Sequence, residues 1–357
     1  MKIFAHKDNN IISGGDGLKS GGTANRDHES SLATRAAWLH FAGGLTQAQV
    51  AKRLGLTSLK AHRLITKANQ EGLVRVFIDG DVAECVELEQ RLTAAYGLDY
   101  CEVVPDLDQE DLPLRGLGIA GAQFLKREID RGEDMLIGVG HGRTLAASVE
   151  YLTRTPAAHI RFVSLLGGVT RKFAANPHDV MHRLAERTGA QAYVMPVPFV
   201  ANTAEDREVL LGQRGISDVF ALAGRSDLMF VGIGTAEREA SLVATGMIEH
   251  SEIDEVKRDG GVGELLAHFF DDKGRPVETA LSERILALPR DQLKGRRIVA
   301  VAGGKVKVRA IKAVLESHYL SGLITDECTA RALVELNQSN GAASAAKRHV
   351  NGGSSNA

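Results

Sequence analysis

Between residues 31 and 80, apolar positions recur with the three- to four-residue period of amphipathic helices. The pattern predicts three short helices. The first runs from near Ser31 to Gly43, the second from the capping residue Thr46 to Gly55, and the third from Thr57 or Ser58 to Gly72. Their inward positions are Ala33, Ala36, Ala37, Leu39, Phe41, Val50, Ala51, Leu54, Ala61, Leu64, Ile65 and Ala68. The next residues, "LVRVFI", alternate like a strand, so the segment is predicted to be a winged helix-turn-helix.

Beyond "DGDVAE" (79–84), which we interpret as an acidic hinge, predicted helices and strands alternate along the chain. The predicted strands are residues 100–105, 134–140, 160–168, 192–198, 227–234, 296–304 and 322–325. The predicted helices are residues 85–98, 116–131, 144–152, 180–188, 207–222, 306–317 and 326–336. Residues 260–274 are expected to be the longest irregular stretch of this part. Such alternation is typical of a parallel sheet covered by helices on both faces, with ligands bound where strands end and helices begin.

These patterns divide the chain into four parts. Residues 1–30 and 337–357 are rich in Gly, Asn and Ser without a sustained period, so both are predicted to be disordered tails. Residues 31–80 form the predicted DNA-binding domain and residues 81–336 the predicted ligand-binding domain. The expected fold class is therefore α/β: an N-terminal winged helix-turn-helix followed by a doubly wound, mostly parallel sheet.

Charge changes this picture more than composition does. The chain of 357 residues has 44% hydrophobic and 25% charged residues, which is ordinary for a soluble protein, and a net charge of only −2. Residues 31–78, however, contain seven Lys or Arg against the single acid Glu71, a net charge of +6 that leaves −8 for the remainder. A basic module joined to an acidic body is a common arrangement in regulators that bind nucleic acid.

Cysteine spacing and apolar run lengths exclude several classes of protein. The three cysteines, Cys85, Cys101 and Cys328, are far apart and lack metal-ligand spacing, so neither a metal nor a disulfide framework is expected. No dinucleotide fingerprint is complete, and no cofactor is expected. No apolar run reaches the length of a membrane helix, and a cytoplasmic protein without a membrane partner is expected.

The basic segment carries the candidate nucleic-acid residues. The second helix of a helix-turn-helix enters the major groove with its N-terminal half against the base edges. The candidate DNA-binding residues at these positions are Thr46, Gln47, Thr57, Ser58, Lys60, His62, Arg63 and Lys67. Arg63 suits bidentate contact with guanine, whereas Thr46 and Gln47 suit phosphate contacts. The alternative is a helical hairpin for protein contacts whose charges are only solvated.

Four predicted strand ends are rich in glycine: "IGVGHGRT", "SLLGGVT", "FVGIGT" and "VAVAGGKVK". Glycine lets the backbone approach a ligand closely, and the following helix N-terminus favours anions or hydroxyl oxygens. The candidate effector-binding residues are Gly140, Gly142, Arg143, Thr144, Gly168, Gly232, Gly234, Thr235, Glu264, Asp271, Gly304 and Lys307. The alternatives are plain turns at the glycines, a polar turn at residues 271–274, and a surface cation at Lys307. His141 is interpreted as a hydrogen-bonding group.

Residues 31–336 resemble the SorC/DeoR-type sugar-binding transcriptional regulators. The resemblance rests on "LTQAQVAKRLGLT…HRLITKANQEGLV", "LEQRLTAAYGL", "IGVGHGRTL", "VPF", "DLMFVGIGT", "GVGELLAHFFDDKG", "AGGKVKVRAI" and "LITDECTARAL", in this order. Many relatives begin the third helix with Ser-Arg-Pro-Thr-Val-Ser-Arg, whereas "TSLKAHR" here has Ser58 and Leu59 in place of the first Arg and the Pro. That variant is similar to the erythritol-catabolism regulators of the family, and the base preference is expected to differ.

The resemblance implies a winged helix-turn-helix and an effector domain similar to sugar-phosphate isomerases, assembled as dimers or tetramers. It implies operator DNA and a sugar, polyol or sugar-phosphate effector as partners, and control of a catabolic operon. It places the phosphate loop on Gly142, Arg143 and Thr144, the lysine after the double glycine on Lys307, and the acidic loop on Glu264 and Asp271.

Two rival functions are weighed against a metabolite-responsive regulator. A sugar-phosphate isomerase or aldolase-like enzyme would use Lys307 or Glu264 in acid/base roles, but a basic winged helix has no purpose in a plain isomerase. A scaffold without a ligand is disfavoured by the repeated glycine loops. The expected function is therefore a DNA-binding regulator and not an enzyme.

Overall fold

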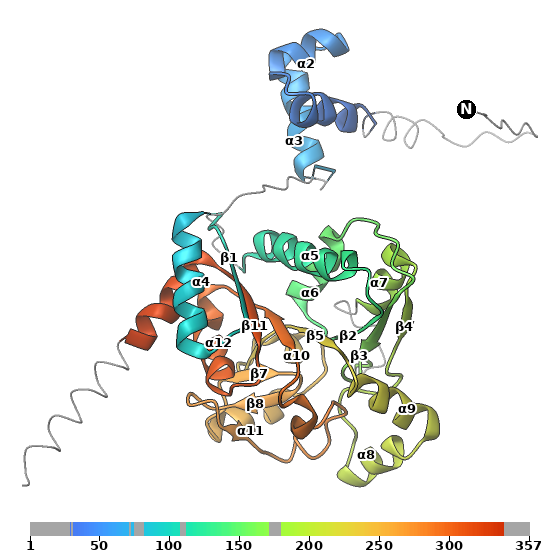
Figure 1. The fold of residues 1–357 in the computed structure, drawn as a ribbon, viewed down its shortest axis with the longest axis vertical. Helices are drawn as coiled ribbons and strands as arrows, with labels where there is room; N and C mark the ends of the chain where they lie inside the picture. The colour runs from blue at the N-terminus through green and yellow to red at the C-terminus, as the bar shows by residue number, and fades with distance from the viewer. Residues whose placement is uncertain are drawn as a thin grey trace, which may run out of the picture. The chain divides into compact units, whose positions relative to one another are not determined.

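The structure is a computed structural model that describes residues 29, 31–70, 73–74, 82–107, 112–170 and 180–338 (Figure 1). The chain divides into two compact units on either side of residue 78. Residues 75–81, which hold most of the predicted wing and hinge, lie outside the described residues. So do residues 1–28 and 339–357 of the predicted tails. Residues 337 and 338, which we assigned to the C-terminal tail, instead complete a helix over residues 327–338.

The N-terminal unit contains the three predicted helices. Residues 31–37 are α-helical and continue into the π-helical turn η1 (Trp38–Ala42), followed by α2 (Gln47–Leu54) and α3 (Ser58–Gln70). Thr46 caps α2 through a capping box with Gln49, and Gly55 ends it at φ +66°. Of the two candidate caps of α3, Thr57 accepts the backbone N–H of Lys60 at 3.3 Å. The unit's core is built from small and branched apolar side chains of all three helices, among them Ala36, Val50, Ala61, Leu64 and Ile65.

The second unit is built on a seven-stranded, fully parallel sheet. Its strands lie in the order β1 (Tyr100–Val104), β11 (Gly322–Asp326), β10 (Ile298–Val301), β5 (Leu228–Val231), β2 (Met135–Val139), β3 (Ile160–Ser164) and β4 (Gln191–Tyr193). From β2 the chain moves outward to β3 and β4, then returns to β5 on the other side of β2. The strand order therefore reverses between β2 and β5, and ligands of open α/β sheets bind at such a switch point.

Helices cover both faces of this sheet, as expected for alternating strands and helices. They are α4 (Ala83–Tyr96), α5 (Leu114–Asp130), α6 (Arg143–Tyr151), α7 (Met181–Thr188), α8 (Ala204–Leu211), α9 (Arg214–Ala223), α10 (Ser241–Ala244), α11 (His250–Arg258) and α12 (Val308–Glu316), with the short helices η2 (Arg290–Leu293) and η3 (Lys305–Lys307). Neighbouring strand residues enter opposite cores: Ile137 and Phe230 pack with α5 and α6, whereas Leu136 and Met229 pack in the core that contains α4 and α12. Both faces are therefore apolar, which accounts for the nearly continuous apolar strands in the sequence.

Two expectations about this unit were wrong. Residues 260–274 are not irregular, because β7 (Gly263–Leu265) and β8 (His268–Phe270) form a hairpin in a small antiparallel sheet with β6 (Gly234–Thr235) and β9 (Pro276–Val277). The hairpin turn consists of Leu266 and Ala267 at φ +49° and +69°, so the usual Asn-Gly signal is absent. The predicted single helix over residues 207–222 is instead two helices, α8 and α9, which end and begin around Gly212.

Candidate ligand cavity and nucleic-acid surface

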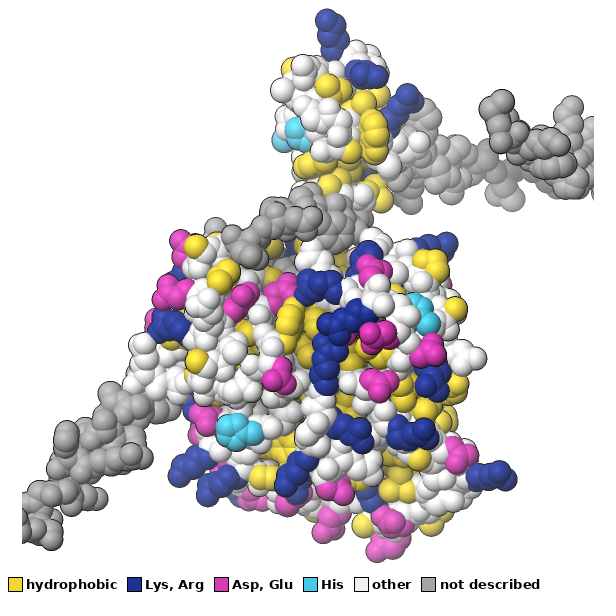
Figure 2. Space-filling model, viewed as in Figure 1, with side chains coloured by type: hydrophobic (Ala, Val, Ile, Leu, Met, Phe, Trp, Pro, Cys, Tyr) yellow, Lys and Arg dark blue, Asp and Glu magenta, His cyan; other side chains and the backbone are white. Residues whose placement is uncertain are grey.

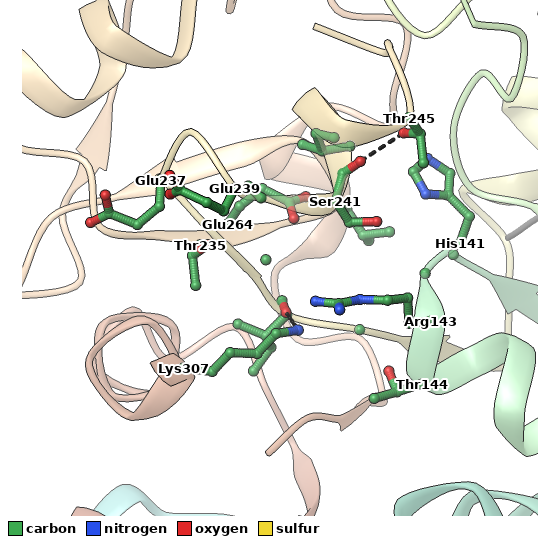
Figure 3. Close-up of a pocket in the computed structure, with 18 of the residues that line it drawn as sticks. His141, Arg143, Thr144, Thr235, Glu237, Glu239, Ser241, Thr245, Glu264 and Lys307 are labelled. Carbon is green, nitrogen blue, oxygen red and sulfur yellow. Dashed lines mark hydrogen bonds between the residues drawn. The ribbon is translucent and has the colours of Figure 1, made fainter. Parts of the chain in front are cut away.

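A cavity of about 510 Å³ lies at the switch point, where the loops after β2 and β5 meet the residues that follow β10 (Figure 3). Nine of the predicted effector residues line it: Gly140, Gly142, Arg143, Thr144, Gly232, Gly234, Thr235, Glu264 and Lys307. They come from segments up to 167 positions apart in the sequence. The parallel sheet brings together the residues that follow β2, β5 and β10, and the small antiparallel sheet carries Gly234, Thr235 and Glu264. The volume is within the range of small-molecule sites.

Two cations, Arg143 and Lys307, lie close together at the cavity. Figure 3 shows the Arg143 guanidinium extending across the cavity toward the Lys307 amine. Lys307 Nζ donates a hydrogen bond to the carbonyl oxygen of Ile233 at 2.7 Å. Burial, together with the neighbouring Arg143 charge, lowers the pKa of Lys307 to about 8, while the Glu264 carboxylate acts in the opposite direction. Two positive charges held this close favour an anionic ligand group between them.

Of the three glutamates that line the cavity, Glu237 and Glu239 are exposed, whereas Glu264 stands on β7 and is largely buried. Its carboxylate accepts the backbone N–H of Ala267 at 2.5 Å. Burial raises its pKa to about 7, although the hydrogen bonds from Ala267 and Gly234 and the charge of Lys307 favour the ionised form. A Cβ at position 234 would lie 2.3 Å from a Glu264 carboxylate oxygen, so any side chain there would displace this carboxylate. The cavity therefore combines two cations with one carboxyl group that titrates near neutral pH.

The N-terminus of α6 also borders the cavity. Gly142 begins it at φ +143°, and no side chain of the described residues caps it. Its first backbone N–H groups thus add partial positive charge beside Arg143. Thr144, which we predicted as a donor, directs its hydroxyl to the carbonyl oxygen of Val301 at 2.8 Å. Its hydroxyl therefore fixes α6 against β10.

One wall of the cavity consists of residues that no sequence motif marked. The residues that line the cavity but were not among our effector candidates are His141, Leu166, Ile233, Glu237, Glu239, Ala240, Ser241, Leu242, Thr245, Leu266 and Val306. Figure 3 shows Ser241, Thr245 and the His141 ring gathered on the side opposite Lys307. Glu237 is exposed and forms an ion pair with Lys257. The segment after β6 carries no glycine motif, and its polar residues alternate with the apolar residues of a short helix, so no sequence signal pointed to it.

Three predicted effector residues do not line the cavity. Asp271 accepts the backbone N–H groups of Lys273 and Arg275, both at 2.9 Å, and pairs with the Arg275 side chain at 2.6 Å. It thus forms the polar turn that the sequence left open as its alternative. The backbone N–H of Gly304 donates to the Asp326 carboxylate at 2.9 Å, and Gly168 lies two residues beyond Leu166.

The predicted nucleic-acid residues lie on the surface of the N-terminal unit. Seven of them are exposed: Thr46, Gln47, Thr57, Ser58, Lys60, His62 and Arg63. Lys67 is half-buried and lies 3.3 Å from Glu29 in an ion pair. On the face of this unit seen in Figure 2, Lys and Arg side chains are visible and Asp and Glu side chains are not. This charge distribution fits a polyanion.

The described residues show neither a metal-binding cluster nor a membrane-spanning helix. They contain no group of three or more His, Cys, Asp or Glu side chains arranged to hold a metal ion. None of their helices has the length and apolar character to cross a membrane.

Comparison with known proteins places these features in context. The family described as "Putative sugar-binding domain" matches residues 80–335. The erythritol catabolism regulatory protein EryD of Brucella abortus is 61% identical over 308 residues, covering 86% of this chain and 98% of its own length. The transcriptional regulator LsrR of Klebsiella pneumoniae is 34% identical over 314 residues, covering 86% and 94%. The crystal structure of the full-length sorbitol operon regulator SorC of Klebsiella pneumoniae has a TM-score of 0.64 at 25% identity, covering 86% and 99%.

Proposed function

Because this chain belongs to the SorC/DeoR family of sugar-binding transcriptional regulators, we propose that it controls the catabolism of a small polyol and that a phosphate ester of that polyol binds in the cavity at Arg143 and Lys307. The chain is a transcriptional regulator, and its partners are DNA and a sugar-type effector. Its relatives are regulators rather than enzymes, so the isomerase hypothesis is not retained.

The observation that carries the proposal is the distribution of charge in the cavity. Arg143, Lys307 and the uncapped N-terminus of α6 form a positive region, and Glu264 faces it from β7. A phosphate group would occupy the positive region, where N–H donors are concentrated. The hydroxyl groups of the same ligand would donate to the Glu264 carboxylate and exchange hydrogen bonds with Ser241 and Thr245. A ligand with one anionic end and several hydroxyls satisfies both sides.

The proposed ligand class is a small polyol because of the similarity to EryD, whose name specifies erythritol catabolism. At 61% identity over nearly its whole length, that relative supports a closely related effector. Erythritol itself is neutral and would place no negative charge between Arg143 and Lys307. Its phosphate ester matches the charge of the cavity better.

Isothermal titration of the full chain tests the ligand class directly. Erythritol, erythritol 4-phosphate, sorbitol 6-phosphate and inorganic phosphate are compared at equal concentrations. We expect the tightest binding for erythritol 4-phosphate and weak binding for inorganic phosphate, which lacks hydroxyl-bearing carbons. Tighter binding of free erythritol would overturn the phosphate assignment while leaving the polyol regulator intact. Binding of none of them would overturn the assignment of both ligand and cavity.

We also propose that the chain assembles with copies of itself as a dimer or tetramer. The α8–α9 segment supports this proposal: α8 buries none of its residues, Val209 is 64% exposed, and Ile216 and Phe220 are only half-buried. A symmetric dimer would recognise two half-sites about one helical turn of DNA apart, or a multiple of it. Light scattering of the wild type and of Val209→Asp tests the surface. An unchanged molar mass for the variant would exclude α8 from the interface.

A further inference from the structure

The outer face of α3 carries an apolar residue where it meets solvent. Ala61, Leu64, Ile65 and Ala68 are all at most 5% exposed and define the side of α3 that faces the core. At about 100° per residue, positions 59, 63 and 66 lie on the opposite side of the helix. These positions are Leu59, Arg63 and Thr66, which we call the outer stripe. Leu59 is 70% exposed, the largest exposed fraction of any leucine in the described residues.

Charged residues on the flanks of α3 indicate which part of DNA the outer stripe faces. Lys60 and Lys67 lie along one flank, and His62 lies on the other. Lysines beside a recognition helix are placed to contact the phosphates that border a groove, so the stripe between the flanks faces the base edges. Leu59 is the second residue of α3, in the N-terminal half that enters most deeply. An exposed leucine at this point meets the floor of the major groove.

We propose that Leu59 determines operator specificity by contacting the C5-methyl group of a thymine, beside a guanine bound by Arg63. The thymine methyl is the one apolar group that a base presents in the major groove, whereas Arg63 can donate two hydrogen bonds to guanine. Leu59 and Arg63 are separated by four residues, about 6 Å along the helix, which corresponds to roughly two base steps. Each half-site therefore contains a thymine and a guanine about two steps apart.

The test begins with duplexes enriched from a randomised library by the full chain. Each thymine of the enriched half-site is then replaced by deoxyuridine, which lacks only the methyl group, and affinities are measured for the wild type, Leu59→Ala and Leu107→Ala. Leu107 is 51% exposed in the other unit and serves as the matched leucine control. Melting curves establish that each variant is folded.

At one thymine per half-site, deoxyuridine is expected to weaken wild-type binding about fourfold, as for the loss of one buried methyl group. Leu59→Ala should bind the thymine and deoxyuridine duplexes equally, whereas Leu107→Ala should behave as the wild type. Equal sensitivity of the wild type and Leu59→Ala at every thymine overturns the proposal. So does enrichment of a half-site without thymine, or the absence of any enriched sequence.

Discussion

Replacing Lys307 by methionine is the most direct perturbation of the proposed effector site. The variant keeps the length and most of the apolar surface of the side chain but removes its charge. Lys307 Nζ lies 2.7 Å from the carbonyl oxygen of Ile233 and beside Arg143, so the amine is fixed at the positive side of the cavity. A hydrogen bond from a charged group contributes about 1.5–3 kcal/mol. The dissociation constant for erythritol 4-phosphate should therefore rise roughly 10- to 160-fold.

Isothermal titration with Lys305→Met as the control measures this effect. Lys305 is exposed, belongs to the same short helix η3, and does not line the cavity. The control should bind erythritol 4-phosphate as the wild type does, because a solvated cation outside the cavity contributes little. An equal loss in both variants would mean that general surface charge attracts the ligand. An unchanged affinity in Lys307→Met would refute the role of Lys307 as an anion ligand.

The pH dependence adds an independent test of the same reasoning. Burial lowers the pKa of Lys307 to about 8, so the amine loses its proton as the pH rises above that value. A bound anion stabilises the protonated amine and therefore favours proton uptake. Wild-type affinity for erythritol 4-phosphate should decrease from pH 8 upward, and Lys307→Met should lack this decrease. The same decrease in both proteins would assign it to another group.

Three further predictions use the same structure. Arg63→Ala should lose about 1–3 kcal/mol of specific DNA affinity in gel-shift titrations, and unchanged binding would remove Arg63 from the interface. The pKa of Glu264, raised from 4.5 to about 7, means that the folded state holds a proton that the unfolded state has released, so stability should fall as pH rises from about 4.5 to 7. At about 1.4 kcal/mol per unit of pKa difference between the folded and unfolded states, the loss of stability is up to roughly 3 kcal/mol. Thermal melts of Glu264→Gln should lack this loss. An equal loss in the wild type and the variant would contradict the assignment to Glu264. Thr46→Ala should cost about 1 kcal/mol in the N-terminal unit, measured by the fluorescence of Trp38, the chain's one tryptophan; an unchanged melt would show that the capping box of α2 contributes nothing.

The sequence predicted those helices and strands whose limits are set by nearby residues. Thr46 marks the start of α2 and Gly55 marks its end. A helix start needs a capping hydroxyl and this helix end needs a left-handed residue, and neither requirement depends on the surrounding structure. The predicted strand at residues 134–140 and the helix at residues 144–152 lie within a residue or two of β2 and α6. Their apolar run and glycine-rich loop satisfy the requirements of a buried parallel strand followed by a helix.

Features that depend on tertiary contacts were not predictable in the same way. The turn at Leu266 and Ala267 adopts left-handed backbone conformations without glycine or asparagine, and Glu264 accepts the Ala267 N–H across it. Nothing in the sequence distinguished Glu264 from Asp271, because both are acids in one segment. The hairpin separates them: Glu264 points into the cavity from β7, whereas Asp271 follows β8 and closes a turn with Arg275.

The contacts of Lys307 and Glu264 suggest how an effector alters the protein. In the structure the Lys307 amine binds the carbonyl of Ile233 after β5, and the Glu264 carboxylate binds the hairpin turn at Ala267. A ligand that recruits either group competes with these internal hydrogen bonds. The free energy of ligand binding is then coupled to the conformation of the loop after β5 and of the β7–β8 hairpin. The turn residues of this hairpin have strained backbone angles. An effector changes DNA affinity only when it binds two conformations of the protein with different affinities. Because Ala267 lies in the hairpin turn and does not line the cavity, substitutions at Ala267 should alter the response to effector without removing a ligand contact.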